Sequence, residues 1–147
     1  MFQITVLHYR HPSKDEESWT RWYLEEQIPR FMPIAKKHGI DRCELYLTPN
    51  RYKERFRNDM KDFKGGCASS YHLAPYDAAV TYWVTDPQKI MNMLADPDFD
   101  NKALAFENGW TDQKKIDLQI GTQTTFLEDG KIINTVVKKY PEKLGSN

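Results

Sequence analysis

The chain has 147 residues, of which 39% are hydrophobic and 13% aromatic, and its 21 basic and 21 acidic residues balance to a formal net charge of zero. This length fits one domain with a sizeable core, and the zero net charge argues against nucleic acid or an anionic membrane surface as a partner. No apolar run is long enough to span a bilayer, no signal peptide is recognisable, and two cysteines are too few for a disulfide framework, so a reduced, cytoplasmic protein is expected.

The first third of the chain is predicted to form a strand, a long helix and a second strand. Residues 4–9 are rich in β-forming side chains and predict the first strand. Ser13 with Glu16 three residues later is typical of a helix N-terminus, and Gly39 is typical of a helix C-terminus. Residues 42–48 alternate between apolar and polar side chains, which predicts the second strand.

The predicted long helix, residues 19–39, places apolar side chains on one broad arc. Gln27 lies near the middle of this arc, where a buried amide has to find hydrogen-bond partners. Pro29 removes a helical hydrogen bond, so we expect a kink just after Gln27. An inward amide beside a kink favours a ligand site, although a glutamine that bonds a neighbouring backbone group explains the same pattern. The arc consists of Trp19, Tyr23, Leu24, Gln27, Ile28 and Phe31.

The middle of the chain predicts a charged helical insertion and a third strand. Residues 51–64 place Tyr52, Phe56 and Met60 at helical spacing among many charges, which indicates a surface helix packed by a thin apolar stripe, with a basic lid as the alternative. Residues 65–70 are rich in glycine and serine and predict a loop. The third strand is then predicted over the aliphatic and aromatic residues that follow, 77–85.

The last third predicts two helices and two strands. The helices are expected over residues 86–94 and 101–108, and the strands over residues 116–127 and 131–137. In the first helix Ile90, Met91 and Leu94 are expected to face the core. Residues 96–99 are interpreted as a turn, and Glu128-Asp129-Gly130 as the turn of a hairpin.

This order of elements is the βαββαβ pattern of an α+β, ferredoxin-like fold, with an antiparallel sheet and helices on one face. We expect a single domain over residues 1–137, with the helical insertion at about residues 50–70, and a polar tail over residues 138–147. The other face of the sheet would carry several aromatic rings, so we expect a second copy to cover it. Two sheets packed face to face would form a homodimeric α/β barrel around a cavity.

The chain resembles the EthD family of the dimeric α/β-barrel group from about residue 3 to residue 134. The resemblance implies a cofactor-free enzyme that acts on an aromatic polyketide, most similar to fungal polyketide-tailoring members. The matching pieces are Tyr9-Arg10 at the end of the first strand, the aromatic helix of residues 19–29, Asp77-Ala78-Ala79-Val80, Asp96-Pro97-Asp98-Phe99 before an acidic helix, and Glu128-Asp129-Gly130-Lys131.

One departure from that family concerns the end of the first helix. Many relatives carry a histidine two residues before a proline there, whereas this chain has Gln27-Ile28-Pro29. An amide takes no proton at neutral pH. Either Gln27 only orients the substrate, or the proton transfer is carried out by another residue.

Cofactor-free lyase chemistry needs a base that works near neutral pH and a donor for the developing enolate oxygen. His8 on the first strand and His72 before the third strand are the candidate bases, although a satisfied core residue also explains His8. Asp77 is a candidate to orient the ring of His72. The remaining histidines, His11 and His38, are assigned to a surface turn and to the C-terminus of the long helix.

Rings and one amide are the candidate substrate ligands, because tyrosines can donate hydrogen bonds and large rings can stack on a flat molecule. They are Tyr23, Gln27, Phe31, Tyr46, Tyr76, Tyr82, Trp83 and Trp110. A shared patch of His8, Tyr23, Gln27, His72 and Trp83 would be the strongest evidence for a site. No metal site is expected, because no cluster has ligand spacing, and no motif for an organic cofactor is present.

The leading hypothesis is therefore a cofactor-independent lyase or cyclase, acting by dehydration, cyclisation or decarboxylation on an aromatic polyketide in secondary metabolism. One alternative is a cofactor-free monooxygenase or isomerase that acts on an anthrone-like substrate. The other alternative is a non-catalytic, dimeric protein that binds an aromatic ligand.

Overall fold

The computed structural model describes residues 1–61 and 71–134, and a four-stranded antiparallel sheet organises them. The order across the sheet is β2-β3-β1-β4, and each neighbouring pair is antiparallel. The strands are β1 (Phe2–His8), β2 (Arg42–Leu47), β3 (Ala78–Val84) and β4 (Asp117–Thr122). The predicted α+β fold is confirmed, and β4 ends five residues earlier than expected.

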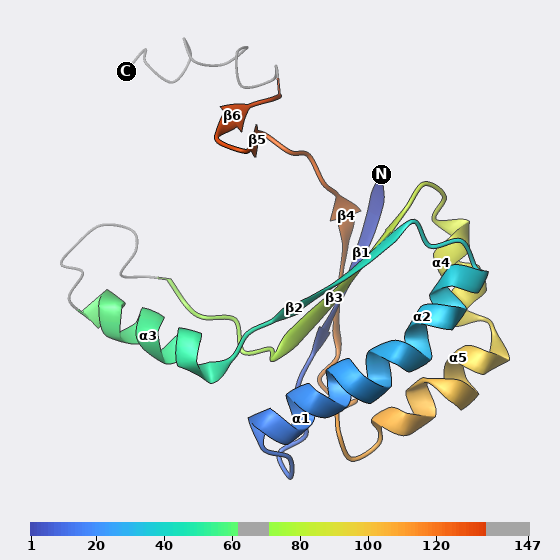
Figure 1. Cartoon of the computed structure of the whole chain (residues 1–147), viewed down its shortest axis with the longest axis horizontal. Coiled ribbons are helices and arrows are strands. Elements are labelled where there is room, and N and C mark those ends of the chain that lie inside the picture. The colour runs from blue at the N-terminus through green and yellow to red at the C-terminus, as the bar shows by residue number, and fades with distance from the viewer. Residues whose placement is uncertain (62–70, 135–147) are drawn as a thin grey trace.

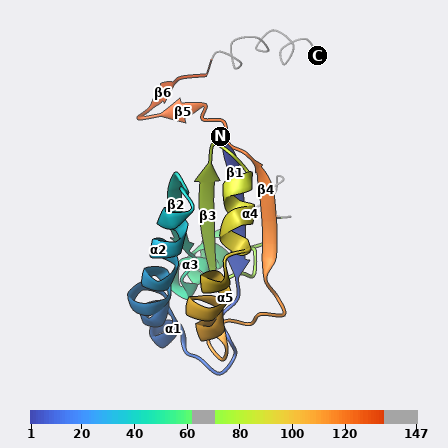
Figure 2. The same cartoon turned by 90° about the vertical axis from the view of Figure 1, so that its right-hand side faces the viewer.

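The helices cover one face of this sheet, as Figures 1 and 2 show. They are α1 (Glu16–Trp22), α2 (Ile28–Lys37), α4 (Gln88–Leu94) and α5 (Pro97–Lys102). On the sheet side of the core, β3 contributes alternate residues such as Val80 and Tyr82, because side chains alternate between the two faces of a strand. Trp19, Phe31 and Met93 come from the helices to meet them.

The other face of the sheet is more polar than predicted. The register places Thr5 beside Thr81, and their hydroxyl oxygens are 2.9 Å apart. Glu44 lies on the other side of Thr81. The rings that the paired strands place on this face are Trp83 and Tyr46, so the expected ring-rich surface is not found among the described residues. The homodimer that was to cover it stays a prediction.

The long helix runs from Glu16 to Lys37 but contains a wide π turn, η1 (Tyr23–Gln27). The Ile28 N–H donates to the Tyr23 carbonyl oxygen, five residues earlier. Pro29 is the second residue of α2 and has no N–H to donate to the π turn that precedes it, so the missing helical hydrogen bond falls where the helix is already wide. The predicted irregularity is therefore a π turn that ends at Gln27 rather than a kink after it.

The π turn changes which side chains of this helix face the core. Trp22 and Tyr23 are both buried, whereas Leu24, which straight helical periodicity placed on the apolar arc, is exposed. The N-terminus also differs from the expectation. Asp15 rather than Ser13 caps α1, because its side chain accepts a hydrogen bond from the Ser18 N–H at 2.8 Å.

Helix α5 is held against the end of α2 through one carboxylate. Asp96 caps α5 by accepting from the Asp98 N–H, and it also lies 2.6 Å from Lys37 Nζ and 2.7 Å from His38 Nε2. Hydrogen bonds from Lys37 and His38 hold the pKa of Asp96 well below its usual range. Residues 96–99 are thus a helix start and not a turn. The chain continues from α5 into a short 3-10 helix, η3 (Leu104–Glu107).

Helix α4 buries a narrower stripe than expected. Ile90 and Met93 are buried, three residues apart on one side of the helix. Met91 and Leu94, which were expected to face the core, are exposed.

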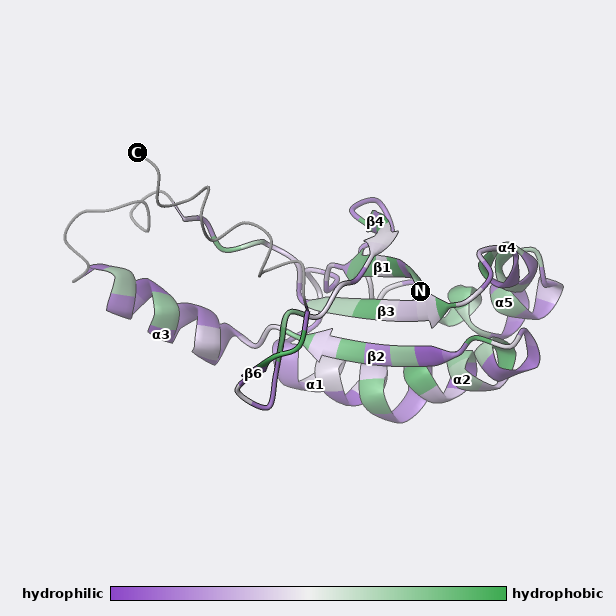
Figure 3. Ribbon diagram, turned by 90° about the horizontal axis from the view of Figure 1, so that it is seen from above, coloured by the Kyte–Doolittle hydropathy of each residue, from purple (hydrophilic) through white to green (hydrophobic). Residues whose placement is uncertain are grey.

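Helix α3 (Asn50–Lys61) extends away from the helices that cover the sheet (Figure 3). It has no buried residue, and the rings of Tyr52 and Phe56 are exposed. The predicted helical insertion is present, but its apolar stripe does not pack into the core. The expected loop over residues 65–70 lies outside the described residues.

A separate hairpin follows the sheet, formed by β5 (Leu127–Glu128) and β6 (Lys131–Ile132). Its turn is made by Asp129 and Gly130, both with positive φ, at 50° and 75°. A two-residue turn of this kind is typical of tight β-hairpins. The turn of the hairpin is confirmed, but β6 covers only residues 131–132 of the strand predicted over 131–137. Residues 135–137 of that strand and the predicted tail over residues 138–147 lie outside the described residues.

Candidate active site

The sheet and the helices of one chain surround a cavity of about 190 Å³. Its walls are mainly aliphatic and aromatic, with Val6 from the sheet and Phe31 and Phe99 from the helices. The polar side chains on its lining are His8, Tyr82 and Glu107. The cavity lies on the helix side of the sheet. The hollow expected between two sheets would need a second copy and stays a prediction.

Glu107, at the end of η3, is the carboxyl group of this cavity, and its exposed fraction is 0%. Its backbone oxygen accepts hydrogen bonds from the N–H groups of Trp110 and Thr111, both at 2.9 Å, which holds the residue in place. Oε1 accepts from Gln27 Nε2 at 3.2 Å, and Oε2 is buried without a partner among the described residues.

The environment of Glu107 suits proton transfer near neutral pH. Burial raises the pKa of its carboxyl from 4.5 to about 7, and the amides of Gln27 and Gln113 act in the opposite direction. At pH 7 the acid and the carboxylate are therefore both populated. A general acid–base group works best when its pKa lies close to the working pH.

Gln27 joins the π turn to η3, and its exposed fraction is also 0%. Besides Glu107, its Nε2 donates to the Ala103 carbonyl oxygen at 3.1 Å. Its Oε1 accepts from Arg30 Nη1 at 3.4 Å, and the Arg30 guanidinium lies 4.1 Å from the centre of the Phe106 ring. The prediction that the inward amide finds partners is confirmed. These contacts fix which end of the amide faces Glu107.

His8 lines the cavity together with Glu107, and Tyr23 packs against His8 but is not part of the lining. Burial lowers the pKa of His8 from 6.5 to about 4, so its ring is neutral at pH 7. The edge of the Tyr23 ring approaches His8, with 5.6 Å between the ring centres. His8 Nδ1 and the Tyr23 hydroxyl are both buried without a partner among the described residues. Burial also raises the pKa of Tyr23, so its hydroxyl keeps its proton.

Two of the eight predicted substrate ligands line the cavity, and the other six, Tyr23 and Gln27 included, do not. Phe31 and Tyr82 line the cavity. Trp83 lies on the other face of the sheet, where its Nε1 donates to Gln123 Oε1 at 2.9 Å. Trp110 stacks on Trp22 at 5.0 Å between ring centres and is not part of the cavity lining. Tyr46 and Tyr76 line a groove beside α3.

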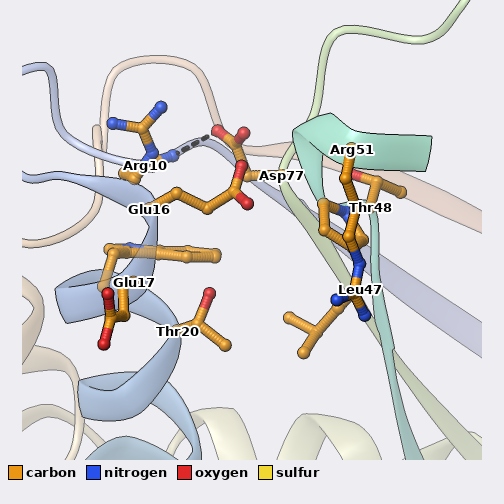
Figure 4. Close-up of a pocket in the computed structure, with 10 residues that line it drawn as sticks. Arg10, Glu16, Glu17, Thr20, Leu47, Thr48, Arg51 and Asp77 are labelled. Atoms are coloured by element: carbon orange, nitrogen blue, oxygen red, sulfur yellow. Dashed lines mark hydrogen bonds between the residues drawn. The ribbon is translucent and has the colours of Figure 1, made fainter. Parts of the chain in front are cut away.

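The structure does not bring His72 and Asp77 together. His72 is exposed in a shallow groove beside Met60 of α3. Asp77 lines a more polar pocket of about 340 Å³, where its Oδ2 accepts from the Arg10 backbone N–H at 2.7 Å (Figure 4). The proposed orientation of His72 by Asp77 is therefore wrong for this structure.

The charged groups of that polar pocket serve mainly to hold chain segments together. Asp77 joins the segment after β1 to the start of β3 through the Arg10 N–H, and Lys53 of α3 lies 3.8 Å from its other oxygen. Glu16 of α1 accepts from the N–H of Asn50 at 3.0 Å, at the start of α3. Because these carboxylates already have partners, the apolar cavity is the better candidate for chemistry.

Glu107 was missed by the sequence analysis, which searched for a base among the histidines. A signal was nevertheless present. Glu107 is the one charged residue in the stretch from Ala103 to Trp110, ALAFENGW, which otherwise consists of small, apolar and aromatic residues with one asparagine. A lone carboxyl group in such a stretch is a candidate for burial, and a buried carboxyl group is a candidate for a raised pKa.

Within residues 1–61 and 71–134 no group of three or more His, Cys, Asp or Glu residues is arranged to hold a metal ion. In the same ranges no helix combines the length and the apolar character needed to cross a membrane.

The chain is similar to several known proteins. Over 134 residues it is 27% identical to the dehydratase iacD of Pestalotiopsis fici, covering 91% of this chain and 94% of the relative. A protein of Aspergillus terreus that is named as an oxygenase is 22% identical over 135 residues, covering 91% of this chain and 81% of the relative.

The fold is shared with the crystal structure of an ethyl tert-butyl ether D (EthD) family protein from Bacillus halodurans. The TM-score is 0.53 and the sequence identity 11%, and the match covers 84% of this chain and 100% of the other. Residues 11–114 match the model of the EthD domain. The chain therefore belongs to the EthD domain family.

Proposed function

We propose that this chain is a cofactor-independent dehydratase that removes water from an aromatic polyketide, with Glu107 as its acid–base group. One observation supports the proposal: a buried carboxyl group with a pKa of about 7 lines an apolar cavity. The similarity to the dehydratase iacD supports dehydration over the cyclisation and decarboxylation that the same groups would also serve.

The reaction suited to these groups is the loss of water from a β-hydroxy ketone. The Glu107 carboxylate removes a proton from the carbon between the carbonyl and the carbinol, and the electron pair moves toward the carbonyl oxygen. The neutral His8 ring donates a hydrogen bond to that oxygen as its negative charge develops. Glu107 then returns the proton to the leaving hydroxyl group, so that water departs and a carbon–carbon double bond forms.

Gln27 acts in this proposal as a positioning residue. It occupies the slot in which many relatives carry a histidine, and it cannot exchange a proton at neutral pH. Its donated hydrogen bond holds Oε1 of Glu107, and in this proposal Oε2 is the oxygen that contacts the substrate. In this proposal Glu107 has the acid–base role, and Gln27 only holds Glu107 in position.

The test uses 3-hydroxy-1-tetralone, which loses water to give 1-naphthol, and follows naphthol fluorescence. We expect turnover by the purified protein and a loss of about 10²–10⁴-fold in kcat for Glu107→Gln, the usual contribution of a general acid–base group. His72→Gln serves as the matched control, because His72 is exposed and lies outside the cavity lining. Its kcat should stay within twofold of the wild-type value.

Three results would contradict the proposal. A Glu107→Gln variant with full turnover would remove Glu107 from the mechanism. A His72→Gln variant without turnover would indicate that His72, in the loop before β3, is the base. Tight binding of 1-naphthol by a wild-type protein that never dehydrates the tetralone would favour the non-catalytic alternative.

A second candidate function is a cofactor-free oxygenase, which the relative from Aspergillus terreus favours. The Glu107 carboxylate would then remove the proton from an anthrone-like substrate before oxygen adds to the carbanion. Oxygen consumption measured with anthrone distinguishes the two functions. The dehydratase proposal predicts none above the uncatalysed rate.

A further inference from the structure

The cavity is small for the molecule that it would have to hold. Its volume is about 190 Å³. An apolar protein cavity of about 150 Å³ holds one benzene ring, whereas sites for drug-sized ligands start at about 300 Å³. The enclosed space therefore suits one or two fused rings. A larger flat molecule would have to extend through the mouth of the cavity.

The mouth of the cavity is bordered by apolar side chains that are exposed. Leu94 of α4 and Leu118 of β4 line the cavity, yet their exposed fractions are 46% and 62%. Ile120 follows on the same face of β4 and is 64% exposed. In the register of the sheet Leu118 lies beside Val6 and Ile120 beside Ile4, and both of these partners line the cavity. We call Leu94, Leu118 and Ile120 the ledge.

The ledge continues the apolar lining of the cavity along the sheet: Ile4, Val6 and His8 follow one another on β1, and Ile120 lies beside Ile4, at the end of this row away from His8. His8 and Glu107, the groups proposed to react, both line the cavity. Exposed apolar side chains that adjoin one another mark binding surfaces more often than isolated ones do. The ledge adjoins a cavity that is itself almost entirely apolar, so a flat apolar molecule fits both surfaces at once.

We propose that the ledge binds the outer rings of a substrate with three or more fused rings, while its terminal ring enters the cavity and reacts at Glu107. This inference rests on the proposed function, because its occupant is the aromatic substrate of that site. Leu94, Leu118 and Ile120 are then specificity-determining residues. They discriminate substrates by ring number and take no part in the proton transfer.

The test compares a two-ring and a three-ring ligand by equilibrium binding, with 1-naphthol and 1,8-dihydroxyanthraquinone as probes in titration calorimetry. The double variant Leu118→Ser/Ile120→Ser should bind the three-ring probe at least tenfold more weakly and 1-naphthol within twofold of wild type. Gln119→Ser is the matched control, because Gln119 lies between them on the opposite face of β4 and is also exposed. It should change neither affinity.

The outcomes separate this inference from the proposed function. Equal weakening of both probes, or no weakening of either, overturns the role of the ledge. A double variant that binds both probes normally but loses a self-association measured by sedimentation would assign the ledge to a second copy, which also overturns it. The proposed function fails on a different result, namely the absence of tetralone dehydration by the wild-type protein.

Discussion

At the residue scale, two buried groups of one cavity are shifted in opposite directions by the same cause. Burial raises the pKa of Glu107 from 4.5 to about 7 and lowers the pKa of His8 from 6.5 to about 4. In both residues burial disfavours the charged form. The cavity thus holds a neutral imidazole beside a carboxyl group that gains or loses its proton near pH 7.

These shifts have opposite effects on folding stability. Below pH 4.5 the Glu107 carboxyl is neutral in the folded and the unfolded chain, and as pH rises to about 7 only the unfolded chain ionises freely, so stability falls. His8 acts the other way. Between pH 6.5 and about 4 the unfolded chain takes up a proton that the folded ring refuses, so stability falls as pH is lowered.

We therefore predict that each single variant, compared with wild type, reveals the contribution of the residue that it removes. Relative to wild type, Glu107→Gln should gain about 3 kcal/mol in free energy of unfolding between pH 4.5 and pH 8. His8→Gln should gain a similar amount, about 3 kcal/mol, when pH is lowered from 7.5 to 4. Urea denaturation at a series of pH values measures both. Curves that stay parallel to wild type would show that neither group is shifted.

The two partners in the central hydrogen bond differed in how far the sequence could predict them. Gln27 was placed on the inward face by helical periodicity alone, and the structure agrees. Glu107 was not found, because its role depends on a contact with Gln27, 80 residues away in the chain. Spacing along a helix or strand carries no information about such a contact, so only composition hinted at it.

At the element scale, the π turn decides where the side chains of the long helix point. The extra residue of η1 lies on the exposed side, at Leu24, Glu25 and Glu26, while Tyr23 and Gln27 are buried. An α-helix advances by about 100° per residue. Removing one exposed residue would restore α geometry with little rotation of the two flanking halves, because a π turn is one extra residue within an α-helix.

Deletion of Glu25 should therefore remove the wide turn that presents Gln27 to Glu107, while the rest of the helix and the fold persist. We expect tetralone turnover to fall at least tenfold and the helical circular dichroism signal to persist. Glu25→Ala is the control, because it keeps the chain length and Glu25 is exposed. Wild-type turnover in the deletion variant would mean that the register of this turn is unimportant to the site.

The prediction of a turn at residues 96–99, where α5 begins, was wrong for a specific physical reason. Aspartate followed by proline fits a turn, and it equally fits a helix start in which aspartate is the N-cap and proline the first helical residue. Asp96 accepts from the Asp98 N–H and is paired with Lys37 and His38 of the neighbouring helix. Those long-range partners favour the helix start, and local sequence does not contain them.

At the scale of the whole molecule, the sequence was sufficient for the sheet and its one-sided helical cover but not for the location of the cavity. The order β2-β3-β1-β4 follows from the βαββαβ pattern. The cavity depends instead on how Phe31, Phe99 and Glu107 meet across separate helices. The single domain and the homodimer stay predictions. The residues that line the cavity all come from one chain, so the candidate site does not depend on a dimer.

The central claim is that Glu107, held by Gln27, is the titrating group of that site, and the pH dependence of kcat for 3-hydroxy-1-tetralone tests it most directly. Because the carboxylate acts first, kcat should rise with pH and level off, with a midpoint near 7. The hydrogen bond from Gln27 lowers the pKa of Glu107, so Gln27→Leu should move the midpoint to higher pH. A midpoint near 4.5, or one that Gln27→Leu leaves in place, would contradict the claim.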